Sequence, residues 1–200
     1  LVLVWMGWFG FTGGSALAAN EIAGLAVLNT NIAAFSAAVM WIFLESSDKT
    51  KVKPSLIGIA TGVLAGLVGV TPAAGFVQPW AAFLIGIITT VPVYFMVRWR
   101  GKSKIDESLD AFACHGVGGV MGAILTGVFA SVNGGSSLIT GDIAQFGIQV
   151  LGVVVTAAYS FIVTLGLALA VKFVLGLRVT DQQEVVGLDK CSHEIGRAHV

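Results

Sequence analysis

The sequence predicts an all-α integral membrane protein, and three observations support this fold class. Of its 200 residues, 56% are hydrophobic and only 11% are charged, whereas an average soluble chain is about 25% charged. The mean hydropathy of +0.91 is more than a soluble domain of this size can bury. Long apolar runs also divide the chain, as expected for helices that cross a bilayer.

Six apolar runs are expected to form the membrane helices. Most are longer than the roughly 9–11 residues of a barrel strand, and few alternate with period two. The last run would be about 50 Å long if helical throughout, so it must tilt, kink or project from a hydrocarbon core about 30 Å thick. The runs are Leu1–Ala18, Ile22–Leu44, Pro54–Val70, Val77–Val97, Asp110–Ser131 and Asp142–Gly176.

Positive charge marks alternate connections and predicts the topology. The connections after runs two, four and six carry Lys or Arg, and the other three carry none. The positive-inside rule therefore places the charged connections and both ends of the chain in the cytoplasm. We expect a membrane domain over residues 1–176 and a cytoplasmic tail over 177–200. The basic residues of these connections are Lys49, Lys51, Lys53, Arg98, Arg100, Lys102, Lys104 and Arg178.

Composition also excludes some classes of protein. Eleven Lys and Arg balance eleven Asp and Glu, so no basic field exists for nucleic-acid binding. Two cysteines in different surroundings suggest no disulfide framework. The chain opens at Leu1 inside an apolar run and without Met, so we expect a piece of a longer protein.

His115 is the foremost candidate for function, because it lies several residues into an apolar run. Ionisable groups at membrane depth are costly and usually line a cavity or pathway. Burial would favour the neutral imidazole, with one donor and one acceptor nitrogen for a small polar solute. The alternative is a core histidine bonded to a helix carbonyl. Cys114 is not expected to share a metal ion with its neighbour, and no cofactor is predicted.

Small residues surround His115 in the sequence. Gly118, Gly119 and Gly122 follow it at helical spacing, where they permit a close backbone approach or leave room for a narrow lumen. Asp110 is expected to cap this helix, its carboxylate accepting the first free N–H groups.

Run three carries glycine at every third or fourth position from Gly58 to Gly69, which predicts tight helix crossing rather than chemistry. The run ends at Thr71 and Pro72. Thr61 lies at membrane depth, where its hydroxyl is available to a permeant or a facing helix.

Run one places Trp8, Phe11 and Ser15 on one helical face. An aromatic wall with a hydroxyl acceptor is able to hold a small cation by cation–π attraction. An interfacial aromatic belt explains the same aromatic residues equally well. At and after the start of run two, Glu21 is expected to cap a helix outside the membrane, and Asn20, Asn29 and Asn31 are expected to tie helices together.

Six blocks of the sequence carry a recognisable pattern, namely Gly7–Ser15, Ala19–Ala23, Lys53–Leu56, Ala65–Ala73, Asp110–Gly119 and Gly176–Val179. In this order they resemble segments of the ammonium transporter family (Amt/Mep, related to Rh proteins). The resemblance extends from Leu1 to about Asp189. Ordered blocks are far more specific than any single motif.

The resemblance implies a fold of eleven helices in two inverted halves, with a long final helix. The six runs would then be helices six to eleven, and the first five would be missing from this chain. Alone, such a chain would lack half of the pore wall and should not conduct.

The resemblance also implies roles for particular residues. His115 would be one of two facing pore histidines, Ser15 would contribute to an outer recruitment site for ammonium, and Trp8 and Phe11 would shape the lumen. Thr61 would line the pore, with Asp110, Gly119 and Thr71 as structural residues near it.

Gly176 and Arg178 would begin a cytoplasmic tail that couples family trimers and meets PII-type regulatory proteins. The departures from the family pattern are Thr12, where asparagine is common, and the atypical ending Cys191–Val200, for which no structural role is predicted.

The resulting hypothesis is a multi-pass transporter of the cell membrane that passes ammonium or ammonia, and not an enzyme. A homotrimer in the lipid bilayer is implied by the resemblance. One alternative is an Rh-like neutral gas channel, and another is an ammonium sensor with a transporter-like domain. A membrane hydrolase is the weakest option, because the sequence contains no GxSxG or HExxH motif.

Overall fold

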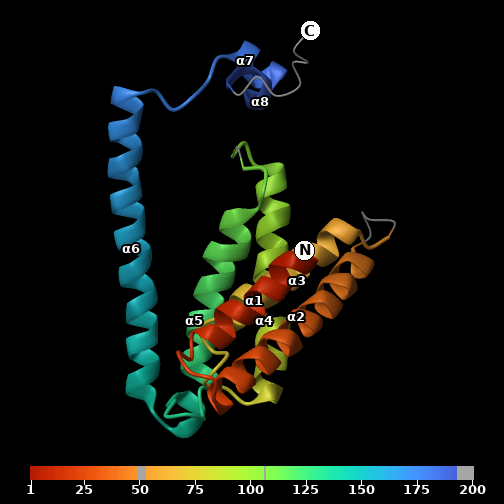
Figure 1. Ribbon diagram of the computed structural model, residues 1–200, viewed down its shortest axis with the longest axis vertical. Coiled ribbons are helices and arrows are strands. Elements are labelled where there is room, and N and C mark those ends of the chain that lie inside the picture. The colour runs from red at the N-terminus through yellow and green to blue at the C-terminus, as the bar shows by residue number, and fades with distance from the viewer. Residues whose placement is uncertain (49–52, 106, 193–200) are drawn as a thin grey trace. The chain divides into compact units, whose positions relative to one another are not determined.

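The computed structural model describes residues 1–48, 53–105 and 107–192, and the regular structure within these ranges is entirely helical (Figure 1). The chain forms two compact units, Leu1–Val153 and Val154–Val200. The expected boundary at residues 176–177 between membrane domain and tail stays a prediction. The helices are α1 Val2–Gly14, α2 Glu21–Ser47, α3 Leu56–Val70, α4 Pro79–Lys102, η1 Phe112–Val117, α5 Gly118–Phe129, η2 Leu138–Thr140, α6 Ile143–Val174, α7 Asp181–Val186 and α8 Leu188–Ser192.

Every apolar run forms a helix, as the sequence predicts. In length and composition, α2, α4, α6 and the continuous segment Phe112–Phe129 are able to cross a membrane. The helices α1 and α3 are apolar but shorter, at 13 and 15 residues. The all-helical fold class is therefore confirmed.

Local sequence explains where the membrane helices begin. The side chain of Asn20 accepts a hydrogen bond from the backbone N–H of Ala23 at the start of α2. The hydroxyl of Ser55 accepts from Gly58 N–H at the start of α3. Pro79 begins α4, where its missing N–H has no cost.

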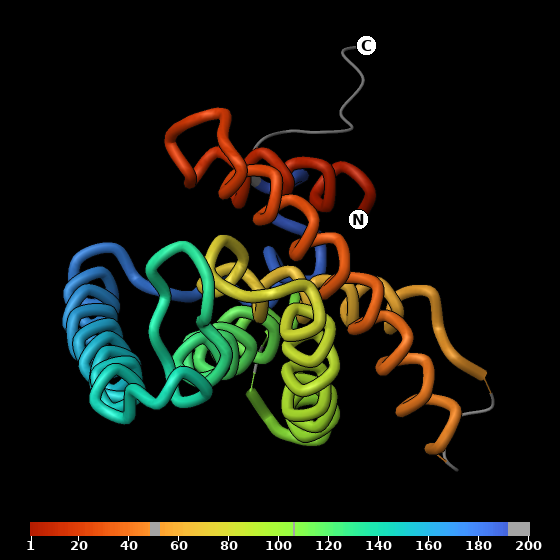
Figure 2. Tube along the Cα trace, turned by 90° about the horizontal axis from the view of Figure 1, so that it is seen from below, coloured from red at the N-terminus to blue at the C-terminus, as the bar shows by residue number. Residues whose placement is uncertain are grey.

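The predicted glycine ladder of α3 is a packing surface. In the first unit, α2 packs on α3 and α4, and α1 packs on α2 (Figures 1 and 2). A Cβ atom on Gly66 would clash with the carbonyl oxygen of Ala33 on α2. A Cβ on Gly122 of α5 would clash with the backbone of Gly69. Only glycine permits these close approaches, so the packing interpretation of the ladder is confirmed.

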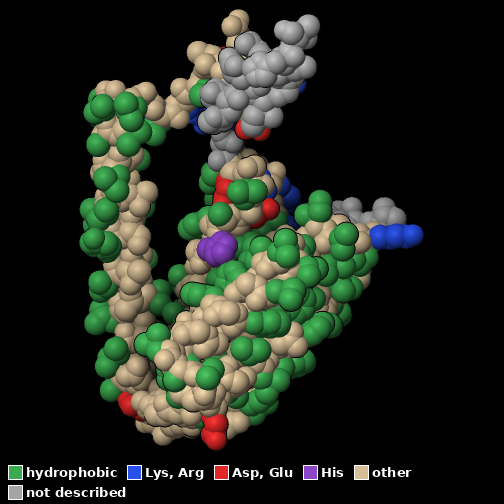
Figure 3. Space-filling model, in the orientation of Figure 1, with side chains coloured by type: hydrophobic (Ala, Val, Ile, Leu, Met, Phe, Trp, Pro, Cys, Tyr) green, Lys and Arg blue, Asp and Glu red, His purple; other side chains and the backbone are tan. Residues whose placement is uncertain are grey.

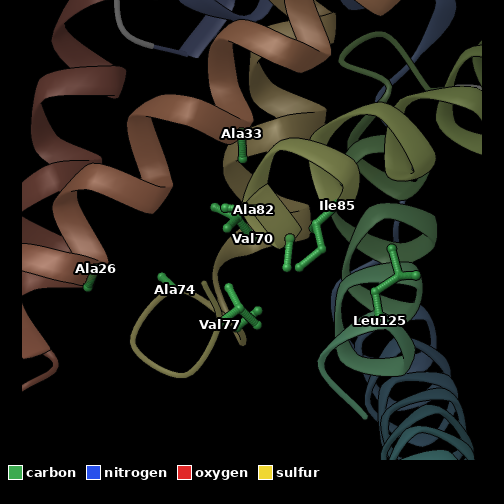
Figure 4. Close-up of a cluster of buried hydrophobic side chains, with 10 residues drawn as sticks. Ala26, Ala33, Val70, Ala74, Val77, Ala82, Ile85 and Leu125 are labelled. Carbon is green, nitrogen blue, oxygen red and sulfur yellow. The ribbon is translucent and has the colours of Figure 1, made fainter. Parts of the chain in front are cut away.

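The core near the α3–α4 connection draws on four helices and this loop. Small side chains let the helices approach closely, and Leu125 reaches in from α5. Asn29 donates from Nδ2 to the carbonyl oxygens of Ala74 and Val77, both at 2.8 Å, and so ties α2 to the connection. Figure 4 shows members of the cluster, namely Ala26, Ala33, Val70, Ala74, Val77, Ala82, Ile85 and Leu125.

Polar groups fasten the other ends of α2, α3 and α4. Arg98 forms an ion pair with Asp48, and Asp48 also accepts a hydrogen bond from the Tyr94 hydroxyl at 3.3 Å. The buried carboxylate of Glu45 accepts from the backbone N–H of Ser55 at 2.8 Å. Lys49 and Lys51, which contribute to the predicted topology, lie outside the described residues.

Asp142 links the connection before α6 to the first turn of that helix by hydrogen bonds. Its carboxylate accepts from Gln145 N–H and from the Ser136 hydroxyl, both at 2.9 Å. These two hydrogen bonds hold the pKa of Asp142 below its ordinary range, because they favour the charged form.

The second unit contains the end of α6 and the short helices α7 and α8. Gly176 has a left-handed φ of 81°, which ends α6, and Arg178 follows in the irregular segment before α7. Thr180 and Gln183 form a capping box for α7. The prediction of no helix from Cys191 onward is wrong for Cys191 and Ser192, which complete α8. Residues 193–200 lie outside the described residues.

Candidate pore site

The centre of the candidate site is the indole of Trp8. This side chain packs on a buried cluster of Ala34, Val63 and Leu67. Its Nε1 donates to the hydroxyl oxygen of Thr71 at 2.9 Å. Its ring stacks on the imidazole of His115, with centroids 6.4 Å apart and planes at 27°. The structure thus joins α1, the end of α3 and η1 at one residue.

Two buried threonines hold the backbone beneath Trp8. Thr12 donates to the carbonyl oxygen of Trp8 at 2.9 Å. The single hydroxyl proton of Thr30 on α2 has two acceptors within reach, the Thr12 hydroxyl oxygen at 2.9 Å and Ala26 O at 2.6 Å. The departure from the family pattern at Thr12 therefore lies within an interhelical hydroxyl pair, behind the aromatic face.

Phe11 extends the aromatic face of α1. Its ring meets Trp8 edge to face, at a centroid distance of 5.9 Å and an interplanar angle of 90°. This geometry is favourable for aromatic pairs. Trp8 contacts both Phe11 and His115, so the aromatic residues of α1 form an intramolecular wall rather than an isolated belt.

The expected pore-lining role of His115 stays a prediction. His115 is exposed, and Figure 3 shows histidine at the surface of the molecule. Its neighbour Cys114 is buried in a cluster with Trp41 and Tyr94. The physical reason is that η1 packs with one face on α3 and α4, and His115 lies on the other face. Within the described chain, Trp8 covers one side of the imidazole.

The helix that carries His115 begins with a π-helical turn. The backbone N–H of Gly118 donates to Ala113 O, five residues earlier. Such turns are rare and often occur at functional sites.

The predicted cap by Asp110 is wrong. The first N–H of η1, that of Phe112, donates instead to Glu107 Oε1 at 2.6 Å. Asp110 adopts a left-handed φ of 52°, and its Oδ1 lies 2.7 Å from Nη2 of Arg100. The carboxylate therefore points to α4 and not along its own helix.

Ser15 and Thr61 bond within their own helices. The Ser15 hydroxyl is exposed and donates to Phe11 O at 2.7 Å, and Thr61 donates to Ile57 O at 3.0 Å. Each oxygen keeps its acceptor capacity. Their expected contact with a permeant stays a prediction.

Gly119 differs from the packing glycines. Apart from its chain neighbours and the nearby backbone of its own helix, no atom of the described residues would lie within 4 Å of a Cβ atom built on Gly119, although Gly122 one turn later is tightly enclosed. Gly119 therefore leaves open space on the helix that carries His115.

The cluster offers an apolar wall beside one polar ring. Thr71 donates to Leu67 O at 2.7 Å and accepts the Trp8 N–H, so the indole presents its face and not a donor. Neither ring nitrogen of His115 has a hydrogen-bond partner within the described ranges, which leaves both open to a small polar solute.

Sequence reasoning missed the two hydrogen bonds that tie Trp8 and Thr12 of α1 to residues of other helices. Thr71 stands 63 positions from Trp8, and Thr30 stands 18 from Thr12. No local spacing signals such a pair. The one available signal was the presence of a threonine within or directly after an apolar run.

Comparison with known proteins identifies the family. The family model described as Ammonium Transporter Family matches residues 1–197. Ammonium transporter Amt1 of Archaeoglobus fulgidus is 47% identical over 194 residues, which cover 96% of this chain and 49% of the relative. The ammonium transporter of Aquifex aeolicus is 46% identical over 96% of this chain and 45% of its own length.

Solved structures agree with these relatives. Saccharomyces cerevisiae Mep2 superposes with a TM-score of 0.85 and 34% identity, over 90% of this chain and 42% of that one. A Sensor Amt Protein superposes with a TM-score of 0.83 and 36% identity, over 94% and 46%. The chain spans about half the length of the curated relatives it matches. Because the family model covers nearly the whole chain, this membrane protein belongs to the ammonium transporter family.

Proposed function

We propose that this chain supplies one half of a pore that carries ammonium or ammonia across the cell membrane. The observation that carries the proposal is the stack of Trp8 on His115, with Phe11 against Trp8 and Thr71 bonded to it. Together these side chains make an aromatic wall that ends at an exposed imidazole.

Physical chemistry favours passage of the neutral molecule. Moving a small cation from water into a medium of low dielectric constant costs an idealised ~20 kcal/mol, and several after relaxation. A cation–π contact returns only about 2 kcal/mol. Deprotonation before the narrow part removes most of the penalty, so the proposed sequence is recruitment outside, deprotonation, passage past His115 and release inside.

Residue roles follow from this sequence of steps. Ser15 and the aromatic face of Trp8 and Phe11 would recruit the cation, since the serine oxygen remains an acceptor. His115 would guide ammonia by hydrogen bonding. Thr61 would line the pore towards the cytoplasm.

The assembly proposed here is a homotrimer of multi-pass chains in the plasma membrane, with cytoplasmic C-termini. Residues 1–176 would form the membrane domain. The tail from residue 177, with Arg178 directly after Gly176, would meet a PII-type regulatory protein.

A hybrid transporter tests the proposal. This chain would replace the matching segment of Archaeoglobus fulgidus Amt1, and the hybrid would be reconstituted in liposomes. We expect an ammonium-driven current, and we expect His115→Ala to change its rate or its selectivity over potassium. The matched control is His199→Ala in the tail. Unchanged rate and selectivity in the His115 variant would exclude the role of His115. An active hybrid that moves ammonia without current would instead support the neutral gas channel.

A second candidate function is ammonium sensing, and the similarity to the Sensor Amt Protein favours it. A sensor needs ammonium to bind but not to pass. Saturable ammonium binding by the hybrid without flux or current, with an output domain encoded after the tail, would support this function over transport.

A further inference from the structure

The direction of His115 depends on how its helix begins. Asp110 stands in the left-handed region, with φ 52°, and the turn that follows is π-helical. A π turn rotates the following side chains about the helix axis compared with an α turn. A contact that fixes this turn therefore also fixes where the imidazole points.

Arg100, in the last turn of α4, makes such a contact. Its Nε and Nη2 atoms lie 2.8 and 2.7 Å from Oδ1 of Asp110. The two side chains are only 25% and 20% exposed, so water screens the pair less than an open surface pair. Charge-assisted bonds of this kind are stronger than neutral ones.

Asp110 transmits the contact to the turn. While its carboxylate faces Arg100, its carbonyl oxygen accepts from the backbone N–H of Cys114 at 2.9 Å. Cys114 is the residue before His115 and is itself buried. One residue thus links α4 to the backbone that presents the imidazole.

The two arginines at this end of α4 form ion pairs with different segments of the chain. Arg98 pairs with Asp48 after α2, and so fastens α4 to α2. Arg100 pairs with the residue just before η1. Glu107 accepts from Phe112 N–H but makes no link to another helix by that bond. Only the Arg100 contact, of these three, joins the His115 turn to α4.

We propose that Arg100 is a positioning residue for His115, acting through its ion pair with Asp110. The consequence for transport rests on the proposed function of His115. The structural part does not, because it concerns the π turn alone.

Alkylation of Cys114 measures the turn directly. The full chain would carry Cys191→Ser, so that Cys114 is its one thiol, and react with N-ethylmaleimide in lipid nanodiscs. We expect Arg100→Gln to raise the reaction rate about tenfold, since losing a charged hydrogen bond opens the turn locally. Arg100→Lys keeps the charge and should restore most of the protection. Lys102→Gln, at an exposed position of the same helix end, is the matched control and should leave the rate unchanged.

A second probe separates local opening from general loosening. A cysteine at Val63, which is buried between α1, α2 and α3, would replace Cys114 as the one thiol. Arg100→Gln should leave this thiol protected. Equal exposure of both thiols would overturn the proposal. Asp110→Asn provides an independent variant, because Asn tolerates the left-handed conformation but carries no charge. If Cys114 reacts with N-ethylmaleimide at the same rate in Asp110→Asn as in the wild-type background, the proposal is overturned, even if Arg100→Gln does not fold.

The hybrid transporter then tests the consequence. Arg100→Gln should shift the selectivity for ammonium over potassium in the same direction as His115→Ala, and Arg100→Lys should restore it. If Cys114 becomes reactive while neither variant alters transport, the proposed function of His115 fails and the positioning contact stands. If Cys114 stays protected in both charge-removing variants, the positioning contact fails whatever transport shows.

Discussion

Glycine has opposite uses at the α2–α3 interface and on the face formed by α1, η1 and the start of α5. At the interface, Gly66 lies against the backbone of Ala33, and no room remains for a methyl group. On the other face, Gly119 leaves open space, and Trp8 and His115 stack nearby. A glycine in an apolar helix therefore either permits close packing of a neighbouring helix or leaves open space. Which of the two occurs depends on whether a neighbouring helix approaches at that position.

The largest expected effect breaks the interface. Gly66→Ala introduces a Cβ that clashes with the Ala33 backbone, which a side-chain rotation cannot relieve. We expect a loss of about 1–3 kcal/mol or more, the usual cost of overpacking. Thermal unfolding in detergent measures it. Gly119→Ala is the matched control and should unfold within about 0.5 kcal/mol of wild type. Equal losses in the two variants would contradict the comparison.

A smaller effect on stability is expected from a change at the candidate site, where Thr71 holds Trp8. Thr71→Val removes the acceptor of the Trp8 N–H and leaves that donor unpaired, at a cost of about 1–3 kcal/mol. The indole should then lose its fixed contact with His115. Tryptophan fluorescence of wild type and variant would report the change. Thr61→Val, which removes a hydroxyl bonded within its own helix, is the control. An unchanged Trp8 environment in Thr71→Val would show that packing alone holds the ring.

A smaller coupling is expected between the two regions. Thr12→Val, Thr30→Val and the double variant form a cycle around the hydroxyl pair that joins α1 to α2. The expected coupling energy is about 1 kcal/mol, typical of one neutral hydrogen bond. Unfolding free energies of the four proteins give it. Strict additivity would mean that the pair does not connect the interface to the site.

The smallest effect on stability is expected at Asp142, which lies outside both of the compared regions. The pKa of Asp142 is lowered in the folded chain by the Gln145 N–H and the Ser136 hydroxyl. Its stabilising contribution is therefore present above the ordinary Asp pKa of about 3.9 and is lost as pH falls through the lower folded value. Asp142→Ala should reduce stability at pH 7, and this loss should become smaller as the pH falls through the folded pKa of Asp142. A loss that does not depend on pH would contradict this cause.

Much of the fold was predictable from local sequence. The six apolar runs match the main helices, because a bilayer requires long stretches of apolar residues in helices. Small-residue spacing predicted the packing face of α3, since glycine four residues apart lies on one side of a helix. The end of α8 was missed, because a helix of five residues leaves no periodic signal.

The candidate site was predictable only in part. Trp8, Phe11 and His115 were expected, and the structure brings them together. The cap by Asp110 was wrong because its partner, Arg100, belongs to another helix. The face that His115 occupies could not be predicted, because hydropathy reports the average of a run and not which face a residue occupies.

The sequence by itself determined the membrane class, the helices and the family, because these depend on composition, periodicity and ordered motifs. Only the tertiary structure decided which face carries the imidazole, which threonine accepts the Trp8 N–H, and which arginine binds Asp110. Those pairings join residues on different helices. Their geometry depends on how closely the helices approach and on the turn before His115, neither of which local sequence encodes.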